Sequence, residues 1–560
     1  MPQEDSDMDS ADEEEDDPAP PTKKRKKAKA PVKARKWEKR DIEYPPLPPF
    51  THPVPACIRS PFEYFQDMFT VDLLEDIVYQ TNLYARQRNV NTTFNTDKHE
   101  MMVFLGVVLY MGVLQLPSIE DYWSTYTRVA QVADVMSSKR FRLIRSLLHF
   151  NNNENIGGST DRFFKIRPIF ASLVRQFLRV KATPTQSVDE VMVAYKGTRS
   201  GSLRQYIKTK PDKWGYKLFC RASIDGFIHD ILMYQGETTF SSHHQELTQE
   251  ESELLVSSKT VIVLAKTLQT PSQAAIYADN YFTSIELVEY LREKLQCRYV
   301  GTVRVNRVGN APLMPTKDMD KKSVPRGKSD YSSTNGILAL RWKDNKIVTV
   351  LSSDAGFEPV KTVKRYDKNA KKKVDVTCPS VIKEYNGKMG GIDKSDMLTH
   401  LYKTPMRARR WYMRLFGYAL DLCVCNAWIL YKRDCKALGE KPMALKFFRL
   451  DISRFARCQK GMVTRVTRTS PEGPLMVPRR GQRAQLPPDQ RRYDATKLHM
   501  PSFVSNRQTC KHCSNKSDVH RSRWMCEVCQ VALCLSDTRN CFKAFHTTPA
   551  AEPSTSATSP

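Results

Sequence analysis

The spacing of apolar residues changes near residue 187, and this change limits the folds that the chain can adopt. Between about residues 61 and 180, apolar side chains recur every three or four positions, most clearly in residues 69–83, 101–114, 141–150 and 169–178. This is the period of amphipathic helices. From Ser187 onward, short runs rich in β-branched and aromatic residues indicate strands. We therefore expect a helical domain followed by a sheet.

The order of elements after Ser187 indicates what kind of sheet this is. Strands are expected over residues 187–195, 217–224 and 227–236, and the last two meet at Asp225-Gly226, a good hairpin turn. A helix (257–268), a strand (274–279), a helix (284–295) and a strand from Arg298 follow. Strands that come first and then alternate with helices predict an α/β fold with a mixed sheet and flanking helices.

Residues 304–378 interrupt this alternation. Two hairpins are expected there, one around Asp344-Asn345 and one within the basic stretch 363–377, so we interpret the segment as a β-rich insertion. Residues 379–401 and 406–432 are predicted to be helical again. A Pro- and Arg-rich linker then leads to a cysteine-rich end.

The charge of the chain points to a polyanionic partner. It has 88 Lys and Arg residues against 61 Asp and Glu residues, a formal net charge of +27, although its first 17 residues hold ten acids and no base. The electrostatic field of so positive a chain attracts nucleic acid. An anionic membrane is the competing partner, but no clearly amphipathic basic helix or lipidation motif supports it. The most apolar run, residues 101–114, is shorter than the roughly 20 residues that a bilayer helix needs.

The first 57 residues combine an acidic run, a Pro-rich patch and a basic cluster, and we expect them to be disordered. The cluster is a candidate nuclear localisation signal, formed by Lys23, Lys24, Arg25, Lys26 and Lys27. A solvated linker that binds polyanions is the alternative. The acidic N-terminus does not resemble a secretory signal, so we expect a reducing compartment, the nucleus, in which cysteines are core thiols or metal ligands.

Four aspartates form a candidate metal site. Asp189 falls on the first strand, Asp279 at the end of a later strand, and Asp393 and Asp396 at the start of a helix, where three-residue spacing puts both on one face. Phosphodiester transfer uses two Mg²⁺ ions about 3.5 to 4 Å apart, and magnesium prefers carboxylate oxygens. The alternative is that each Asp is an ordinary turn or cap residue.

The chain resembles the piggyBac transposase family through an ordered set of motifs. They are YMGVLQLPSIEDYWS (110–124), SKRFRLIRSLLHFNNNE (138–154), KIRPIF (165–170), SVDEVMVAYKG (187–197), YADNYFTS (277–284), YNGKMGGIDKSDM (385–397) and the cysteine-rich end. The resemblance implies an RNase H-like catalytic core with an Asp189, Asp279 and Asp393 triad, Asp396 being a further acid of the third motif. It also implies a homodimer that cuts transposon ends in double-stranded DNA and inserts at TTAA. One departure is HFNNNE, where an Asp often follows the first Asn; it lies outside the triad.

With this resemblance, the predicted domains can be given boundaries. They are disordered tails over 1–57 and 551–560, a helical dimerisation and DNA-binding domain over 58–183 and 403–480, the RNase H-like catalytic domain over 184–303 and 379–402, the insertion domain over 304–378, a linker over 481–504 and a cysteine-rich zinc domain over 505–550.

The cysteine-rich end is predicted to bind two structural Zn²⁺ ions. Six of the 14 cysteines fall within the last 51 residues and include two CxxC pairs. Seven ligands follow from the pattern: Cys510, Cys513, Cys526, Cys529, Cys534, Cys541 and His546. Two tetrahedral sites need eight, and Asp537, at a position where the family tends to have His, is the expected eighth; His512 and His520 are alternatives. Core thiols are the competing interpretation.

Two basic clusters are candidate DNA contacts. The first, interleaved with aromatic residues, comprises Lys196, Arg199, Arg204, Lys208, Lys210 and Trp214. The second, at a predicted helix start, comprises Arg407, Arg409, Arg410 and Arg414. A solvated loop over an aromatic core is the alternative for the first cluster.

The sequence thus favours a DNA transposase. The alternative is a domesticated nuclear DNA-binding or chromatin protein that no longer transposes. A zinc-dependent transcriptional regulator without enzymatic ancestry would leave the Asp motifs unexplained.

Overall fold

A computed structural model describes residues 34–547, apart from residues 199, 209, 244, 368–370, 407, 459–491, 494–497 and 516–517. The chain divides into two compact units, Met1–Val466 and Thr467–Pro560, and each is described by itself. The candidate nuclear signal at Lys23–Lys27 and the tail 551–560 lie outside the described residues.

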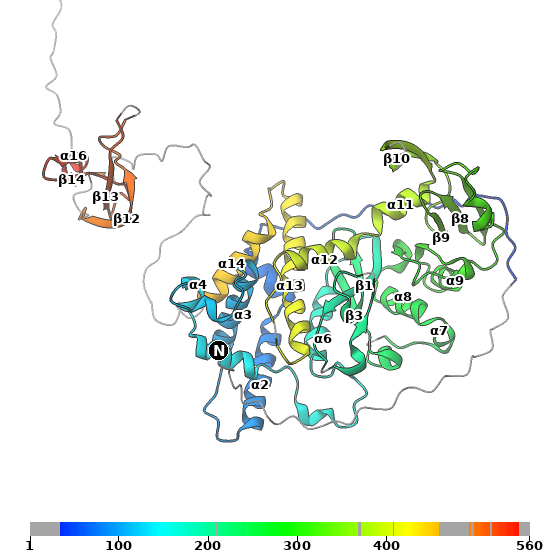
Figure 1. Ribbon diagram of the computed structural model, residues 1–560, viewed down its shortest axis with the longest axis horizontal. Coiled ribbons are helices and arrows are strands. Elements are labelled where there is room, and N and C mark those ends of the chain that lie inside the picture. Colours follow the sequence, from blue (N-terminus) through cyan, green and yellow to red (C-terminus); the bar gives the residue numbers. More distant parts are fainter. Residues whose placement is uncertain are drawn as a thin grey trace, which may run out of the picture. The chain divides into compact units, whose positions relative to one another are not determined.

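A mixed sheet of nine strands is the centre of the first unit (Figure 1). Its order is β2-β3-β1-β5-β6-β9-β8-β7, with β4 beside β3; β1, β5 and β6 run parallel, and the other pairs are antiparallel. The strands are β1 (Thr185–Ala194), β2 (Gln205–Tyr206), β3 (Trp214–Ser223), β4 (Ile228–Met233), β5 (Ala275–Ala278), β6 (Arg298–Thr302), β7 (Ser329–Thr334), β8 (Ile337–Lys343) and β9 (Ile347–Ser352). The predicted α/β fold with a mixed sheet is confirmed.

Helices cover both faces of this sheet. On one face, α8 (Val256–Lys266) and α9 (Ile285–Lys294) close an apolar core, with the short α7 (Gln249–Glu253) next to them. On the other face, α11 (Ser380–Lys388) packs on β5, β6 and β8, while α6 (Arg167–Phe177), α12 (Gly391–Leu401) and α13 (Tyr412–Ala437) cover β1, β3 and β4. The sheet is therefore buried on both sides around β1 and β5.

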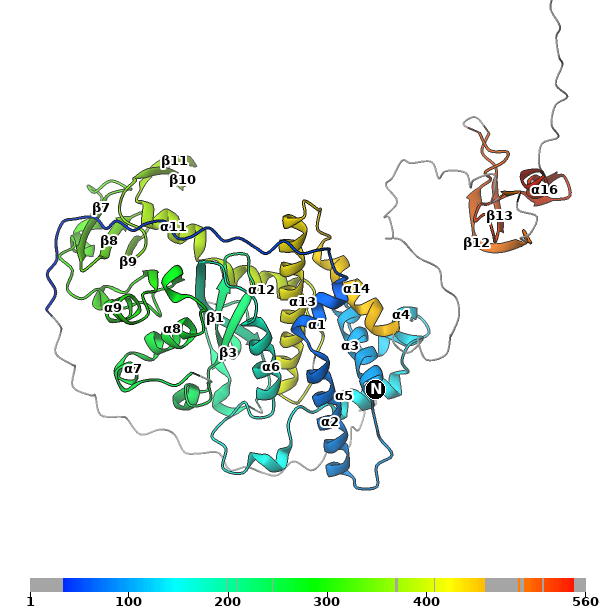
Figure 2. The ribbon, with the colours of Figure 1, turned by 180° about the vertical axis from the view of Figure 1, so that it is seen from behind.

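The helical region combines segments from before and after the sheet (Figure 2). Its further helices are α1 (Pro61–Met68), α2 (Val71–Arg88), α3 (Lys98–Val113), α4 (Ala130–Ala133), α5 (Ser138–Leu147) and α14 (Leu445–Cys458). A buried ion pair, Arg449 to Asp421 at 2.8 Å, joins α14 to α13. The helix α13 is long and apolar enough to cross a membrane, but 78% of its apolar stretch is buried within the protein, as in a core helix.

The long helix α13 also joins the helical region to the sheet. The Asn426 side chain donates to the carbonyl of Ile228 at 2.9 Å and accepts from its amide at 3.0 Å, so it clamps the start of β4. Arg433 forms a two-bond ion pair with Asp225 in the β3–β4 turn, at 2.8 and 3.0 Å. One continuous apolar core therefore runs from the helices to this face of the sheet.

The β-rich insertion is part of the main sheet rather than a separate layer. Its strand β9 pairs with β6, in the register Val300↔Ser352, and β8 and β7 follow. The expected hairpins are confirmed as β8–β9 and as β10 (Lys361–Asp367) with β11 (Lys372–Cys378), which form a two-stranded sheet of their own. The short helix α10 (Thr316–Met319) lies within the same segment. The pairing with β9 covers the backbone groups of β6 that would otherwise form an open sheet edge.

The expectation that residues 1–57 are disordered is wrong for residues 34–57, which we call the N-terminal strap. Glu38 and Ser333 of β7 exchange two backbone hydrogen bonds, at 2.9 and 2.8 Å. Arg35 pairs with Glu289 of α9 at 2.6 Å, and His52 contacts Asp434 of α13 at 2.5 Å. The strap has no core of its own and is ordered by these polar contacts and by apolar packing, since Ile42 is buried in the core beside the sheet. It crosses from β7 to α1 (Figure 2).

The second unit is small and contains β12 (Pro501–Thr509), β13 (Arg521–Cys526), β14 (Leu535–Ser536), β15 (Arg539–Asn540) and α16 (Cys541–His546). Its first strand begins inside the stretch 481–504, which was predicted as a linker. Half of the buried residues in its core are cysteines, namely Cys510, Cys526, Cys529 and Cys541. So small an apolar core indicates that another element, such as bound metal, stabilises this unit.

Candidate active site and zinc module

The sheet register brings Asp189 and Asp279 together. The parallel strands β1 and β5 pair up to Val188↔Ala278, and the next residue on each strand is one of the two aspartates. Neighbouring strands lie about 4.8 Å apart, and side chains alternate between faces. Both carboxylates therefore leave the same face as the pair Ser187↔Tyr277. Asp279 also has a turn role, since its Oδ1 accepts from the Tyr281 amide at 2.9 Å.

A glycine lets α12 start directly on β1. A Cβ atom at Gly391 would lie 2.4 Å from the Ser187 Oγ and 2.6 Å from the Ser223 carbonyl oxygen, so a larger residue would push the helix away. Ser187 lies two residues before Asp189, and Asp393 lies two residues after Gly391, in the first turn of the helix. The partial positive charge of a helix N-terminus favours a carboxylate there.

Tyr385, on α11, lies near enough to all three acids for their charges to act on its hydroxyl. Burial raises the pKa of Tyr385 to about 12, and the charges of Asp279, Asp189 and Asp393 each raise it as well. Three carboxylates, from β1, the end of β5 and α12, thus act on a single half-buried side chain. The structure therefore groups the three aspartates that the sequence singled out.

The four acids differ in exposure, since Asp189, Asp279 and Asp396 are half-buried and Asp393 is exposed. Burial raises the pKa of Asp189 to about 7, with Glu190 and Asp279 adding to the rise. Burial likewise raises the pKa of Asp396 to about 6. Among the described residues, the buried Oδ1 of Asp396 has no hydrogen-bond partner. A cation stabilises neighbouring carboxylates that are partly removed from water, so Asp189, Asp279, Asp393 and Asp396 fit a site for divalent magnesium.

Lys210 lies at this cluster. Its Nζ donates to the carbonyl oxygen of Glu190 at 3.1 Å, and its charge lowers the pKa values of both Asp189 and Asp396. The sequence suggested only a phosphate contact for this lysine. Its position beside the acids could not be inferred from spacing, because Lys210 and Asp396 are distant in sequence.

The other residues of the first basic cluster lie on the surface. Lys196, Lys208 and Trp214 are exposed, and Arg204 is half-buried. The Arg204 guanidinium stacks over the Trp214 ring, 4.3 Å from its centroid. Arg199 lies outside the described residues.

The second basic cluster separates into residues with different roles. Arg409 is exposed. Arg410 donates to the carbonyl oxygens of Leu148, at 2.8 Å, and Arg145, so its guanidinium holds the C-terminal end of α5 instead of facing solvent. Arg414 is half-buried on α13, which begins at Tyr412, and Arg407 lies outside the described residues.

Two groups of four side chains in the second unit can each hold a metal ion. One comprises Cys510, Cys513, Cys534 and Cys541, and the other comprises His499, Cys526, Cys529 and His546. Within each group the candidate ligand atoms lie within 4.8 Å of one another. Seven of these residues were predicted. The eighth is His499 and not Asp537, which is exposed on the turn between β14 and β15 and belongs to neither group.

The surroundings of the two histidines suit zinc. The Nδ1 of His546 contacts the Phe542 carbonyl oxygen at 2.8 Å, which leaves Nε2, 3.3 Å from the Cys529 Sγ, to face the group. His499 presents Nδ1, 3.3 Å from the Cys526 Sγ. Burial lowers the pKa of His546, which favours the neutral form that binds metal. The donor sets, four thiols and two thiols with two imidazoles, are those of structural zinc sites.

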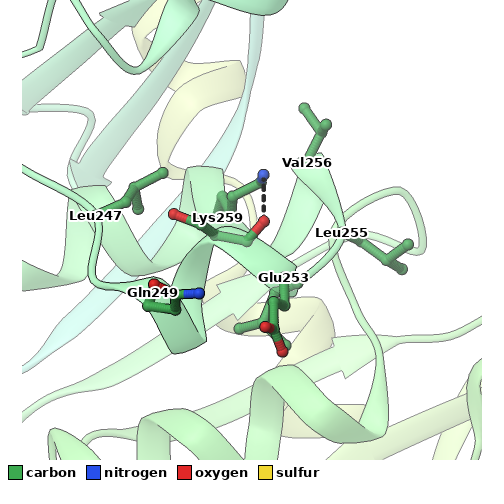
Figure 3. Close-up of a pocket in the computed structure, with 8 residues that line it drawn as sticks. Leu247, Gln249, Glu253, Leu255, Val256 and Lys259 are labelled. Carbon is green, nitrogen blue, oxygen red and sulfur yellow. Dashed lines mark hydrogen bonds between the residues drawn. The ribbon is translucent and has the colours of Figure 1, made fainter. Parts of the chain in front are cut away.

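A surface pocket elsewhere in the first unit has a different character. It lies at the α7–α8 junction, where Leu247, Leu255 and Lys259 line it, and Lys259 donates to the Ser252 carbonyl oxygen at 3.0 Å (Figure 3). None of the predicted site residues lines it.

Comparison with known proteins identifies the family of the chain. The family model described as transposase IS4 matches residues 60–428. PiggyBac transposable element-derived protein 3 of Homo sapiens is 33% identical over 422 residues, which cover 74% of this chain and 68% of that protein. PiggyBac transposable element-derived protein 2 of Homo sapiens is 32% identical over 423 residues, covering 73% and 68%.

A solved structure agrees as well. The piggyBac transposase in a synaptic complex with hairpin DNA superposes with a TM-score of 0.60 at 21% identity, covering 85% of this chain and 95% of that one. A match at 21% identity is evidence for the fold alone. Together with the family match and the human relatives, the motifs and the sheet that carries the three aspartates show that the chain belongs to the piggyBac transposase family.

Proposed function

We propose that this protein is a piggyBac-like DNA transposase, which cleaves and transfers DNA strands in a metal-dependent reaction at Asp189, Asp279 and Asp393. The observation that carries the proposal is the placement of these acids, on β1, at the end of β5 and in the first turn of α12, where the charges of all three act on the half-buried Tyr385. Acids placed by three separate elements around one point are what a phosphodiester-transfer site requires.

The residues of the site would have different roles in this reaction. Asp189, Asp279, Asp393 and Asp396 would hold magnesium, which supplies charge neutralisation for the attacking and leaving oxygens of the phosphodiester. The paired strands and the close seating of Gly391 keep the carboxylates in place before DNA arrives. Lys210 keeps a positive charge beside Asp189 and Asp396 and so reduces repulsion within the cluster.

The proposed substrate is double-stranded DNA, with transposon ends as the cleaved sites and TTAA as the target. Support comes from the family resemblance, from the net charge of +27 and from the hairpin DNA in the complex of the solved relative. On the same grounds we propose a homodimer, and the basic cluster Lys23–Lys27 supports action in the nucleus. The two cysteine-containing groups are proposed to bind Zn²⁺ as structural ions.

A second candidate is a domesticated DNA-binding or chromatin protein without transposition. The positive charge and the metal-binding groups of the second unit support DNA binding whether or not strands are cut. The aspartate cluster is the feature that distinguishes the two candidates, so the test has to address these acids.

Strand cleavage by the purified full-length protein provides this test. With DNA carrying the ends of its element, the wild type should nick DNA only when Mg²⁺ is added. The Asp279→Asn variant should lose more than the roughly 10–100-fold that follows when only a hydrogen-bonding partner of a metal ligand is removed. DNA affinity should be retained.

Asp318→Asn is the matched control, because it removes an exposed carboxylate on α10. It should cleave like the wild type. Equal cleavage by the Asp279 variant would contradict the catalytic assignment. DNA binding without any cleavage by the wild type would favour the second candidate.

A further inference from the structure

Two exposed aromatic rings stand side by side on the β2–β3 hairpin. Tyr206 and Trp214 form a cross-strand pair, with ring centroids 4.8 Å apart, and are 51% and 43% exposed. The guanidinium of Arg204 stacks on the Trp214 ring, and it also donates to the Gly197 carbonyl oxygen at 2.8 Å. We call these three side chains the aromatic platform. Aromatic area of this size, fixed by strand pairing and left in solvent, needs a partner with a flat face.

The platform is tied to the elements that carry the acids. Between its two rings, the chain returns to β1, where Lys210 binds the Glu190 carbonyl oxygen next to Asp189. The same segment also contacts the end of α12, because the Asp212 carboxylate lies 3.6 Å from the His400 Nε2 and 3.7 Å from the Lys403 Nζ. The two rings thus flank residues 207–213, and Lys210 in the middle of this segment lies beside the aspartate cluster.

The charge around the platform is that of a DNA-binding surface. Residues 196–217 contain seven Lys and Arg residues, and Asp212 is the only acid in this stretch of sequence. Of these residues, Lys196, Lys208 and Lys213 are exposed. Phosphates can meet these charges while a base meets the rings. A protein or lipid partner that is apolar alone would leave the lysines without a role.

We propose that the aromatic platform stacks an unpaired nucleobase of the DNA strand that lies next to the scissile phosphate; this inference rests on the proposed function. Bases inside a duplex have both faces covered by their neighbours, so a protein ring can reach a face only where a base is unpaired or turned out. Stacking on an aromatic side chain tolerates any base. The platform would therefore recognise distorted DNA at the cutting site rather than a sequence.

Loss of the platform should weaken the binding of one class of DNA selectively. Removal of a base-stacking ring reduces affinity by roughly 5- to 150-fold. We expect a decrease in this range for a duplex with one unpaired base after Trp214→Leu or Tyr206→Leu. Binding of a fully paired duplex should change little, because the lysines remain. Trp214→Phe, which keeps a ring, should restore most of the difference.

The measurement uses the full-length protein without added Mg²⁺, so that no strand is cut. The probe is a duplex with one unpaired 2-aminopurine, whose fluorescence falls when the base stacks; the same duplex with 2-aminopurine paired to thymine is the reference. Wild type and Asp279→Asn should both quench the unpaired probe, and Trp214→Leu should not. Tyr126→Leu, which removes a ring that is 97% exposed elsewhere on the surface, is the control and should quench like the wild type.

The outcomes separate this inference from the proposed function. The inference is overturned if the wild type does not quench the unpaired probe. It is also overturned if Trp214→Leu quenches and binds this probe as the wild type does. Either outcome counts even if the protein cleaves DNA. Quenching that depends on Trp214 in a protein that never cleaves DNA supports the platform and contradicts the proposed function. Circular dichroism of each variant shows whether it is folded, and Trp214→Phe keeps the test valid if the leucine variant is not.

Discussion

Arg409 and Arg410 are adjacent in sequence, yet the structure gives them different surroundings. Arg409 is exposed, whereas Arg410 holds the last carbonyl groups of α5, which lack partners within their own helix. Composition treats the two alike, because four Arg residues within eight positions look like one phosphate-binding cluster. Only the packing of α5 against the segment before α13 distinguishes a surface charge from a helix cap.

Separate substitutions of Arg409 and Arg410 should distinguish these two roles. Arg409→Glu should reduce the slope of log affinity against log salt concentration by about 1 for a phosphate contact that is lost, without changing thermal stability. Arg410→Ala should lower the free energy of unfolding by about 1 to 3 kcal/mol, because it leaves buried carbonyl groups unpaired. DNA binding at several salt concentrations and thermal unfolding measure the two effects.

Arg409→Lys is the matched control, since it keeps the charge. A salt slope that stays the same in Arg409→Glu would contradict the contact, and an unchanged unfolding temperature in Arg410→Ala would contradict its structural role.

At the same scale, the acids were the most predictable part of the site. Asp189, Asp279 and Asp393 could be selected because a strand, a strand end and a helix start are recognisable from local sequence, and the family motifs carry them. Their burial could not be predicted. Burial raises the pKa of Asp189 to about 7, and this burial depends on elements such as α11 and α12 that pack on β1, which is a property of the tertiary structure.

At the scale of elements, the zinc module shows where motif spacing stops being informative. The CxxC pairs revealed Cys510 with Cys513 and Cys526 with Cys529, because both partners lie on one turn. His499 precedes β12 and is a single residue without a paired ligand nearby. It joins its group because the β12–β13 hairpin folds back, so that Pro501 pairs with Cys526. A pattern within one loop cannot encode that contact.

Zinc content should decide between His499 and Asp537. Full-length wild-type protein should contain two zinc ions per chain, one for each group of four ligands. His499→Ala should reduce the content toward one ion, because three ligands hold zinc less tightly than four. Asp537→Ala should leave two. Elemental analysis after dialysis against a weak chelator provides the measurement, and the reverse result for the two variants would restore the prediction from sequence.

At the scale of the whole molecule, alternation of strands and helices was sufficient to predict the class of the fold. The extent of the sheet was not predictable. The pairing of β6 with β9 joins the insertion to the sheet across residues 303–346, and nothing in either strand specifies its neighbour. The N-terminal strap was missed for a similar reason, because its composition is that of a disordered segment and its partners are far away in sequence.

Removal of the strap should destabilise the first unit. Deletion of residues 1–57 leaves Glu289, whose side chain is 10% exposed, without its Arg35 partner. Loss of one partner of a buried charge pair costs on the order of 3 to 5 kcal/mol. Thermal unfolding should therefore begin at a lower temperature. Deletion of residues 1–33, which lie outside the described residues, is the control and should have no such effect; equal unfolding temperatures for the two deletions would contradict a structural role for the strap.

The strap also has a consequence for how the protein is made. Arg35 lies 254 positions before Glu289, and His52 lies 382 positions before Asp434. At a translation rate of about 5 to 20 residues per second, His52 leaves the ribosome roughly 20 to 80 s before its acceptor has been synthesised. The part of the strap around His52 must therefore stay soluble without this contact until α13 has been made. A nascent chain that stops before Asp434 lacks the partner of His52, so the complete set of strap contacts marks a first unit whose synthesis has passed Asp434.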